Sequence, residues 1–355
     1  MHLNESRCRT AERCLRAYWF YFCAGPGGHG YRHRMVDKKL AWGSIIHAGL
    51  AAHYRGQPVR PALDTSLAEE FPTFQAESYA FKNEWLDELD RIERILGRYA
   101  QWAAPQDNFV PFGVEQSGSA ILGESCWRCG TPYIVKDTAE PCQACMAERH
   151  HFVFRLDLLV RNDYGLEVWD HKSTESSIDD KYLARWDHSY QMFGYCYGAG
   201  KRSGLPVPRY TVNIIRKVLA AEAAPDMTKC CPDCKAGKRK ILTCETCSQT
   251  GRVPRAERPA DTPFVRKTFD FSPTKRDQFV SARVRLANKL TEHTLRLREG
   301  DLTAFPHNPS SWSCPEICYI PAGADIRSAF VSDEKYLTKG PDYVTLKAMA
   351  REEVA

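Results

Sequence analysis

Two aspartates and a lysine lie close together in the segment HFVFRLDLLVRNDYGLEVWDHKS, where two predicted strands flank the turn NDYG. A hairpin centred between Asp163 and Tyr164 places Asp157 directly opposite Asp170. Their Cβ atoms are then expected about 5 Å apart. Lys172 lies on the same face, because residues two apart on a strand point the same way. A register shift of one residue would separate the two carboxylates.

Two neighbouring carboxylates repel each other unless a cation lies between them. Oxygen ligands favour Mg²⁺ or Mn²⁺ over zinc. A lysine beside such a metal can orient or deprotonate a water molecule, or stabilise a phosphate that gains charge. The pattern therefore predicts metal-assisted hydrolysis of a phosphodiester. The alternative is a surface ion pair between Asp170 and Lys172, which leaves Asp157 without a role.

Hydrophobic periodicity predicts the elements that must position these residues. Helices are expected at 5–22, 39–55, 77–103, 186–198 and 273–299, strands at 150–160, 166–172, 209–218 and 264–271, a hairpin at 109–123, and a linker at 58–66. Helices followed by strands, with a helix between two strands, favour an α/β fold with a three-layer core.

Fifteen cysteines, many in C-x-x-C pairs, indicate metal binding in a reducing compartment. Two groups have the spacing of four-cysteine zinc sites. The first group is Cys126, Cys129, Cys142 and Cys145, and the second is Cys231, Cys234, Cys244 and Cys247. Such sites are closed and usually structural. The alternative is contact with nucleic acid or a partner, for which the basic loop KAGKRK at 235–240 is a candidate.

The series Asp157, then Asp170-His171-Lys172, resembles the D…(D/E)-x-K signature of the PD-(D/E)XK nucleases. It is most similar to the RecB/AddB-like branch, which includes CRISPR-associated and phage exonucleases. That branch has a G-x-x-x-H helix, a Q-x-x-x-Y helix and a strand glutamate. The matching positions are Gly43 and His47 in WGSIIHAGL, Gln191 and Tyr195 in YQMFGY, and Glu115 in VEQSG.

The resemblance implies a restriction-endonuclease-like core, a central mixed sheet flanked by helices, with the two zinc modules inserted. It implies that His47, Asp157, Asp170 and the backbone carbonyl of His171 bind the catalytic metal. Lys172 would be the catalytic lysine. In the same way Gln191 and Tyr195 would position DNA or brace the site, and Glu115 would join the catalytic set or be an exposed strand residue.

Some members of this branch hold a [4Fe–4S] cluster between N-terminal and C-terminal cysteines. Cys14 in ERCLRAYWF resembles the N-terminal element, and Cys314 and Cys318 resemble the C-terminal one. The third C-terminal cysteine is absent, so Cys8 or Cys23 would have to complete the four ligands. A remnant site, a third zinc site and buried free thiols are the alternatives.

The predicted domain organisation has three parts. Residues 1–105 form an N-terminal helical region that contributes His47. Residues 106–300 form the nuclease core, with zinc modules at 124–147 and 229–252, and residues 301–355 form a cysteine-containing tail.

We expect a Mg²⁺- or Mn²⁺-dependent DNA exonuclease that acts on ends or single strands, in phage or cellular DNA processing or recombination. A helicase or recombination protein is the expected partner. A non-catalytic zinc-bearing subunit that binds nucleic acid or protein, and a zinc-ribbon RNA-processing factor, are the alternatives. The formal net charge of +5 adds little, because two four-thiolate zinc sites would lower it to about +1.

The composition also bears on location. The sequence lacks an apolar run of about 20 residues and an apolar N-terminal leader. We therefore expect a soluble protein without membrane contact, in the cytoplasm of a bacterium or a phage-infected host.

Overall fold

The computed structural model describes residues 1–24, 30–33, 38–71, 79–133, 140–176, 178–217, 228–230, 252–254, 263–301, 303–306 and 336–338. Its elements are β1 (His2–Leu3), α1 (Glu5–Arg13), α2 (Leu15–Phe22), β2 (Tyr31–His33), α3 (Lys38–Tyr54), α4 (Val59–Glu70), α5 (Tyr79–Ala103), β3 (Val110–Ile121), β4 (His151–Asn162), β5 (Gly165–Thr174), α6 (Asp180–Ala184), α7 (Tyr190–Ser203), β6 (Arg209–Arg216), β7 (Thr228–Cys230), β8 (Arg252–Pro254), β9 (Phe264–Asp270), α8 (Pro273–Arg298) and β10 (Tyr336–Thr338).

A mixed sheet forms the centre of the molecule, as predicted. Five of its strands follow the order β1-β4-β5-β6-β9. The sixth strand, β3, also pairs with β4 but lies outside this order. The β5–β6 and β1–β4 pairs are parallel and the others are antiparallel. Two short pairs, β2 with β10 and β7 with β8, lie outside this sheet. Among the described helices, none has the length and hydropathy needed to cross a membrane.

The predicted register of the central hairpin is confirmed. Strands β4 and β5 pair from Leu158 opposite Trp169 to Asn162 opposite Gly165. The Asn162 side chain accepts a hydrogen bond from the Tyr164 amide, and Gly165 has φ +104°, a conformation that favours glycine. The hairpin thereby brings Asp157 and Asp170 to the point where its ladder of backbone hydrogen bonds ends.

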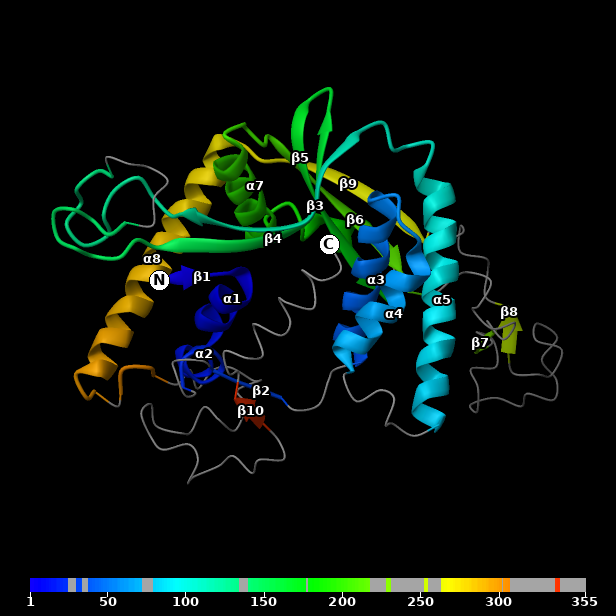
Figure 1. The fold of residues 1–355 in the computed structure, drawn as a ribbon, viewed down its shortest axis with the longest axis horizontal. Helices are drawn as coiled ribbons and strands as arrows, with labels where there is room; N and C mark the ends of the chain where they lie inside the picture. Colours follow the sequence, from blue (N-terminus) through cyan, green and yellow to red (C-terminus); the bar gives the residue numbers. More distant parts are fainter. Residues whose placement is uncertain are drawn as a thin grey trace.

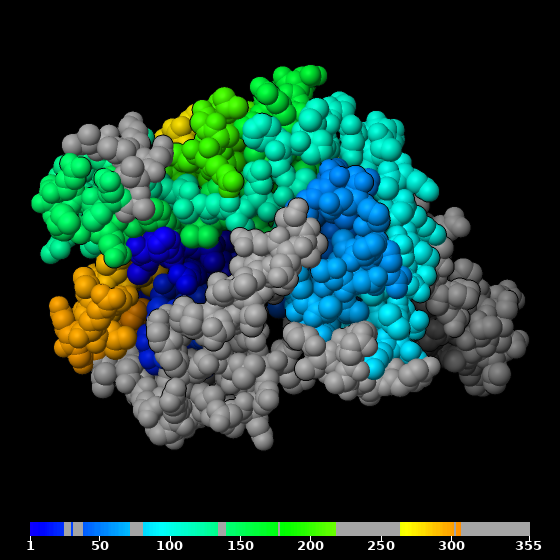
Figure 2. Space-filling view, viewed as in Figure 1, coloured from blue at the N-terminus to red at the C-terminus, as the bar shows by residue number. Residues whose placement is uncertain are grey.

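Helices cover both faces of the sheet (Figure 1). Helices α1, α2, α7 and α8 share one core with β4, β5 and β6, which includes Phe152, Val168 and Tyr210. Helices α3, α4 and α5 form a second core that reaches the sheet at Ile215 and Phe264. In the space-filling view these two groups of helices occupy opposite ends of the molecule (Figure 2). The arrangement is the predicted three-layer α/β fold.

Three predicted elements were wrong. Residues 109–123 form one strand, β3, and not a hairpin, because the strand pairs along its length with β4. The predicted linker at 58–66 lies in α4, whose N-cap is Pro58 and whose first turn holds Pro61, where a missing N–H costs no helical hydrogen bond. The predicted helix at 5–22 breaks at Cys14, whose backbone is extended at φ −159°.

Helix α7 approaches β4 closely because it presents glycines to the strand. A Cβ atom on Gly194 would overlap the ring of Phe152, and one on Gly198 would overlap the ring of Phe154. A larger residue at either position would push the helix away from the sheet. Because α7 also carries Gln191 and Tyr195, these glycines set the distance of that pair from the strands.

We predict that Gly198→Ala lowers the free energy of unfolding by about 1–3 kcal/mol, because the added methyl group overpacks the contact with Phe154. Urea unfolding followed by circular dichroism measures the change. The matched control is Gly200→Ala in the same helix, where the added Cβ would lie an ordinary 3.4 Å from the Leu205 carbonyl oxygen. Equal effects of the two substitutions would contradict the packing argument.

Candidate functional site

Asp157 and Asp170 are buried at the end of the β4–β5 ladder, with 8% and 1% of their surfaces exposed. Beyond Leu158 and Trp169, the His171 amide donates its hydrogen bond to Asp157 Oδ2 at 2.7 Å. The carboxylate thus replaces a backbone partner, which fixes Asp157 beside β5. The two acids are thus buried next to each other, in the strand register that the sequence predicted.

Lys172 extends from the same strand toward these acids. Its Nζ lies 2.5 Å from Asp170 Oδ2, and its side chain keeps 22% of its surface exposed. The same ammonium group lies 5.4 Å from the centre of the Trp186 ring, in the turn directly after α6. A cation held between a buried carboxylate and an aromatic ring, yet reached by solvent, can contact a substrate.

Two further predicted residues come from other elements. His47 on α3 has Nδ1 3.3 Å from Asp157 Oδ1. Glu115 on β3 has φ +53°, a sparsely populated conformation for a residue that is not glycine, and its carboxylate binds Arg155 at 2.5 Å. Ligand atoms of His47, Glu115 and Asp157 all lie within 4.8 Å of one another. Asp170 is not part of this group, and its carboxylate is directed to Lys172.

The pKa values of the acids in the site are shifted in opposite directions. Burial raises the pKa of Asp170, and Asp157 adds to the effect, while Lys172 opposes it. Burial also acts to raise the pKa of Asp157, but His47, His171 and Lys172 outweigh it and lower that pKa below its ordinary value. Burial and Asp157 raise the pKa of Glu115. The cationic neighbours therefore favour the ionised form of Asp157, whereas burial opposes ionisation of Asp170 and Glu115.

Gln191 and Tyr195 meet on one face of α7, as their i, i+4 spacing predicted. Gln191 Nε2 donates a hydrogen bond to the Tyr195 hydroxyl at 2.9 Å. Burial raises the pKa of Tyr195, and the nearby charges of Asp170 and Asp157 raise it further. The tyrosine therefore lies within electrostatic reach of both acids, on the layer opposite His47.

Sequence reasoning missed a polar network behind the site. Asn213 on β6 is fully buried, and its Nδ2 lies 2.8 Å from His171 Nδ1 and 2.9 Å from the Tyr99 hydroxyl. Arg266 on β9 donates to the Tyr99 and Tyr54 hydroxyls. Burial lowers the pKa of His171 to about 3, so the imidazole is neutral and accepts from Asn213. The asparagine within the apolar strand RYTVNIIR was the only sequence signal.

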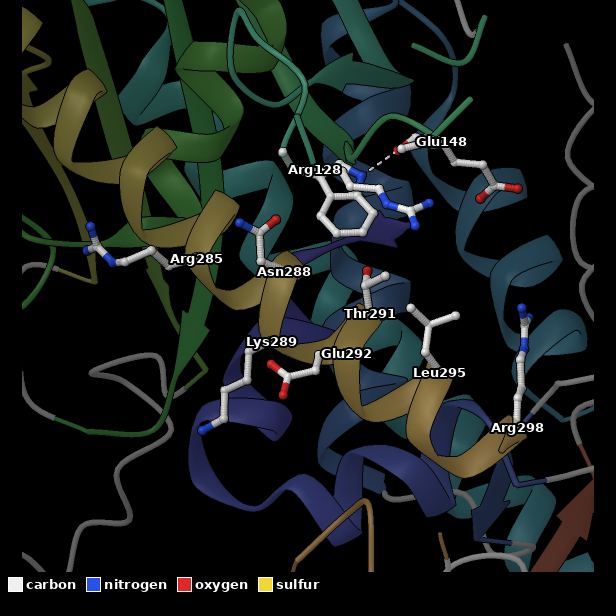
Figure 3. A pocket seen from close by; sticks show the side chains of 11 residues that line it. Arg128, Glu148, Arg285, Asn288, Lys289, Thr291, Glu292, Leu295 and Arg298 are labelled. Carbon is white, nitrogen blue, oxygen red and sulfur yellow. Dashed lines mark hydrogen bonds between the residues drawn. The ribbon is translucent and has the colours of Figure 1, made fainter. Parts of the chain in front are cut away.

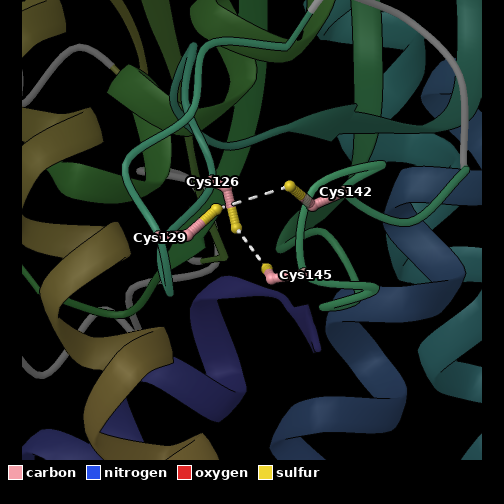
Figure 4. Close-up of side chains that lie close together, drawn as sticks. All are labelled: Cys126, Cys129, Cys142 and Cys145. Atoms are coloured by element: carbon pink, nitrogen blue, oxygen red, sulfur yellow. Dashed lines mark hydrogen bonds between the residues drawn. The ribbon is translucent and has the colours of Figure 1, made fainter.

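The first cysteine group forms a compact cluster beside the β3–β4 connection (Figure 4). Its sulfurs pair at 3.5 Å (Cys126 with Cys145) and 3.6 Å (Cys129 with Cys142). A tetrahedral four-thiolate site with zinc–sulfur bonds of about 2.3 Å separates its sulfurs by about 3.8 Å. The four sulfurs therefore have the spacing that a zinc ion requires.

The protonation of the cluster is also suited to a metal. The Thr131 hydroxyl lies 3.2 Å from the Cys129 sulfur and lowers the pKa of that thiol to about 6. At Cys145 the Ala147 amide favours the thiolate, but burial and the other sulfurs raise the pKa to about 12. Four adjacent thiolates repel one another, so full deprotonation requires a cation between them.

The structure describes only one of the other cysteine ligands given in the predicted site. Cys14 is buried between α1 and α2. Cys231, Cys234, Cys244, Cys247, Cys314 and Cys318 lie outside the described residues. The second zinc module and the iron–sulfur cluster stay predictions.

A family model described as the PD-(D/E)XK nuclease superfamily matches residues 2–320, nearly the whole chain. The chain belongs to the PD-(D/E)XK nuclease superfamily. Comparison with curated proteins gave no match. The mixed sheet with flanking helices is consistent with the restriction-endonuclease-like fold expected of a PD-(D/E)XK nuclease. Membership implies a hydrolase that cleaves phosphodiester bonds of nucleic acid with divalent metal ions.

We predict that Cys142→Ser lowers the zinc content by about one ion per chain, because three thiolates cannot complete a closed tetrahedral site. Elemental analysis of the purified protein measures this change. Cys196→Ala is the control, since Cys196 is buried in α7, away from the cluster. Unchanged zinc in the Cys142 variant would exclude metal binding by this cluster.

Proposed function

We propose that this PD-(D/E)XK nuclease is a Mg²⁺- or Mn²⁺-dependent DNA exonuclease of the RecB/AddB-like branch. One observation carries the proposal. Asp157 and Asp170 are buried together, with Lys172 against Asp170 and His47 against Asp157. A non-catalytic subunit gains nothing from two buried acids in contact with a histidine and an accessible lysine.

The donor set fits a divalent metal. His47, Glu115 and Asp157 supply two oxygen ligands and one nitrogen within 4.8 Å of one another. Asp170 and the carbonyl of His171 are the further candidates, beside Asp157 on the adjoining strand. A bound Mg²⁺ or Mn²⁺ would polarise a phosphate and lower the pKa of a bound water molecule. The convergence of these oxygen and nitrogen donors at Asp157 is the property of this chain that favours such binding.

Lys172 has the role of the catalytic lysine in this proposal. Asp170 and the face of Trp186 hold its ammonium group, so few orientations remain to be lost when substrate binds. From this position Nζ would orient the attacking water and donate to the phosphate oxygens as they gain charge. The Gln191–Tyr195 pair would hold the substrate strand on the α7 side.

Exonuclease action, DNA as substrate, a role in phage or cellular recombination and a helicase partner rest on the resemblance of the G-x-x-x-H and Q-x-x-x-Y helices to the RecB/AddB-like branch. Structural zinc in the first cysteine group is supported by its sulfur spacing.

We predict that Lys172→Ala lowers cleavage of end-labelled DNA at least about 100-fold, because the positioned ammonium group acts in the transition state. The assay uses single- and double-stranded DNA with Mg²⁺ or Mn²⁺, and a chelator abolishes the activity. Lys267→Ala, an exposed lysine on β9, is the control. Products shortened stepwise from an end support exonuclease action, whereas internal cuts contradict it. A wild-type protein that cleaves neither substrate overturns the enzyme proposal.

We predict that His47→Ala weakens Mn²⁺ binding about tenfold or more, because it removes the nitrogen donor from the group at Asp157. Titration calorimetry with Mn²⁺ measures the affinity directly, without cleavage. The control is His188→Ala, whose side chain is 83% exposed. If both variants bind Mn²⁺ like the wild type, His47 is not a ligand.

A further inference from the structure

A groove lies between helix α8 and residues next to the four-cysteine cluster, and none of the candidate active-site residues lines it (Figure 3). Its volume is about 790 Å³. One wall consists of residues beside the cysteines, Trp127, Arg128 and Glu148, and the other is the exposed side of the C-terminal half of α8. The Trp127 ring stacks on His150 at 5.2 Å, and its Nε1 donates to the Glu148 carbonyl oxygen, so this wall is fixed.

The lining of the groove is basic. Its cations are Arg128, Arg285, Lys289 and Arg298, and its carboxylates are Glu148 and Glu292, which leaves a net charge of +2. Arg285 and Lys289 lie one helical turn apart and point to the same side of α8. Within the described part of the chain, no ion pair joins any of these four cations to a carboxylate. They are exposed and available to an external anion.

The dimensions of the groove suit an extended polyanion. From Arg285 to Arg298 the helix rises about 20 Å at 1.5 Å per residue. A stacked strand, with about 3.4 Å between nucleotides, would place about six phosphates along that length. A small anion would contact only one of these cations, so the row of four favours an extended polyanion.

The groove lies near the N-terminal end of β4, the strand that carries Asp157. Strand β4 carries Asp157 and runs to His151, next to the groove wall, a distance of about 20 Å at 3.3 Å per residue. In Figures 1 and 2 the connection between β3 and β4, which carries the cysteine cluster, lies with α8 at the end of the molecule to which β4 leads. A strand cleaved at Asp157 could therefore extend into the groove.

We propose that this groove binds the sugar–phosphate backbone of the nucleic acid substrate, beyond the nucleotides held at the cleavage site. The inference rests on the proposed nuclease function. In this proposal the cysteine cluster contributes to substrate binding, because it positions Arg128 opposite α8. An acidic protein segment would satisfy the same charge, but the alignment with Asp157 along β4 favours the substrate.

The test measures binding without cleavage, in Lys172→Ala protein and in buffer without added divalent metal. The probe is single-stranded DNA of about 30 nucleotides, long enough to fill both the site and the groove. Arg285→Ala with Lys289→Ala removes two groove cations. Arg98→Ala with Lys267→Ala, exposed positions on α5 and β9, removes the same charge elsewhere. Fluorescence anisotropy at several salt concentrations gives the affinities.

The groove variant should bind this DNA strand about tenfold more weakly, with the salt dependence reduced by about 1.4 for two lost phosphate contacts. The control variant should show little change. Glu292→Gln should strengthen binding of this strand. Unchanged binding by the groove variant would overturn the proposal and leave an acidic protein segment as the occupant. Equal loss for the groove variant and the control variant would overturn it as well. This assay measures binding and not cleavage. The nuclease proposal is tested by the cleavage assay, so the two proposals can fail independently.

Discussion

The burial of Asp157 and Asp170 where β4 and β5 separate is the constraint on which the rest of the structure depends. Two acids removed from water in one place are unfavourable unless hydrogen bonds and cations compensate them. The His171 amide, the His47 ring and the Lys172 ammonium supply that compensation from three different positions. The His171 amide and Lys172 belong to β5, and His47 belongs to α3. Packing of the sheet and of the helices on both of its faces holds these groups in place.

Two hydrophobic cores meet at the site. The core beneath α7 and α8 holds the strands that carry the acids, and the core of α3, α4 and α5 holds His47. The network from Asn213 through Tyr99 to Arg266 joins them, since Tyr99 belongs to α5 and Arg266 to β9. This network fixes the ring orientation of His171. In the sequence His171 lies between Asp170, a candidate metal ligand, and Lys172, the candidate catalytic lysine.

The sequence was most informative where the structure is local. The β4–β5 hairpin could be predicted because its turn chemistry and its alternation of residues agree. The four cysteines could be grouped because paired C-x-x-C turns have few uses. The polar network could not be predicted, since its members are separated by 114 residues from Tyr99 to Asn213 and no period relates them. Helix α4 was missed because its two prolines suggested a break, although both lie at its start. Strand β3 was missed because its glycines suggested a turn, although Glu115 supplies the unusual backbone conformation instead.

The division between the two cores has a consequence for how the enzyme would lose activity on heating. His47 depends on α3, and the packing of α3 rests on side chains such as Ile45, Leu50 and Leu96, which belong to the core of α3, α4 and α5. A layer packed largely against itself would open as a local unit while the sheet stays folded. Inactivation would then precede the cooperative melting of the protein and would be reversible on cooling. The thermal limit of catalysis would be set by one helical layer and not by the stability of the whole domain.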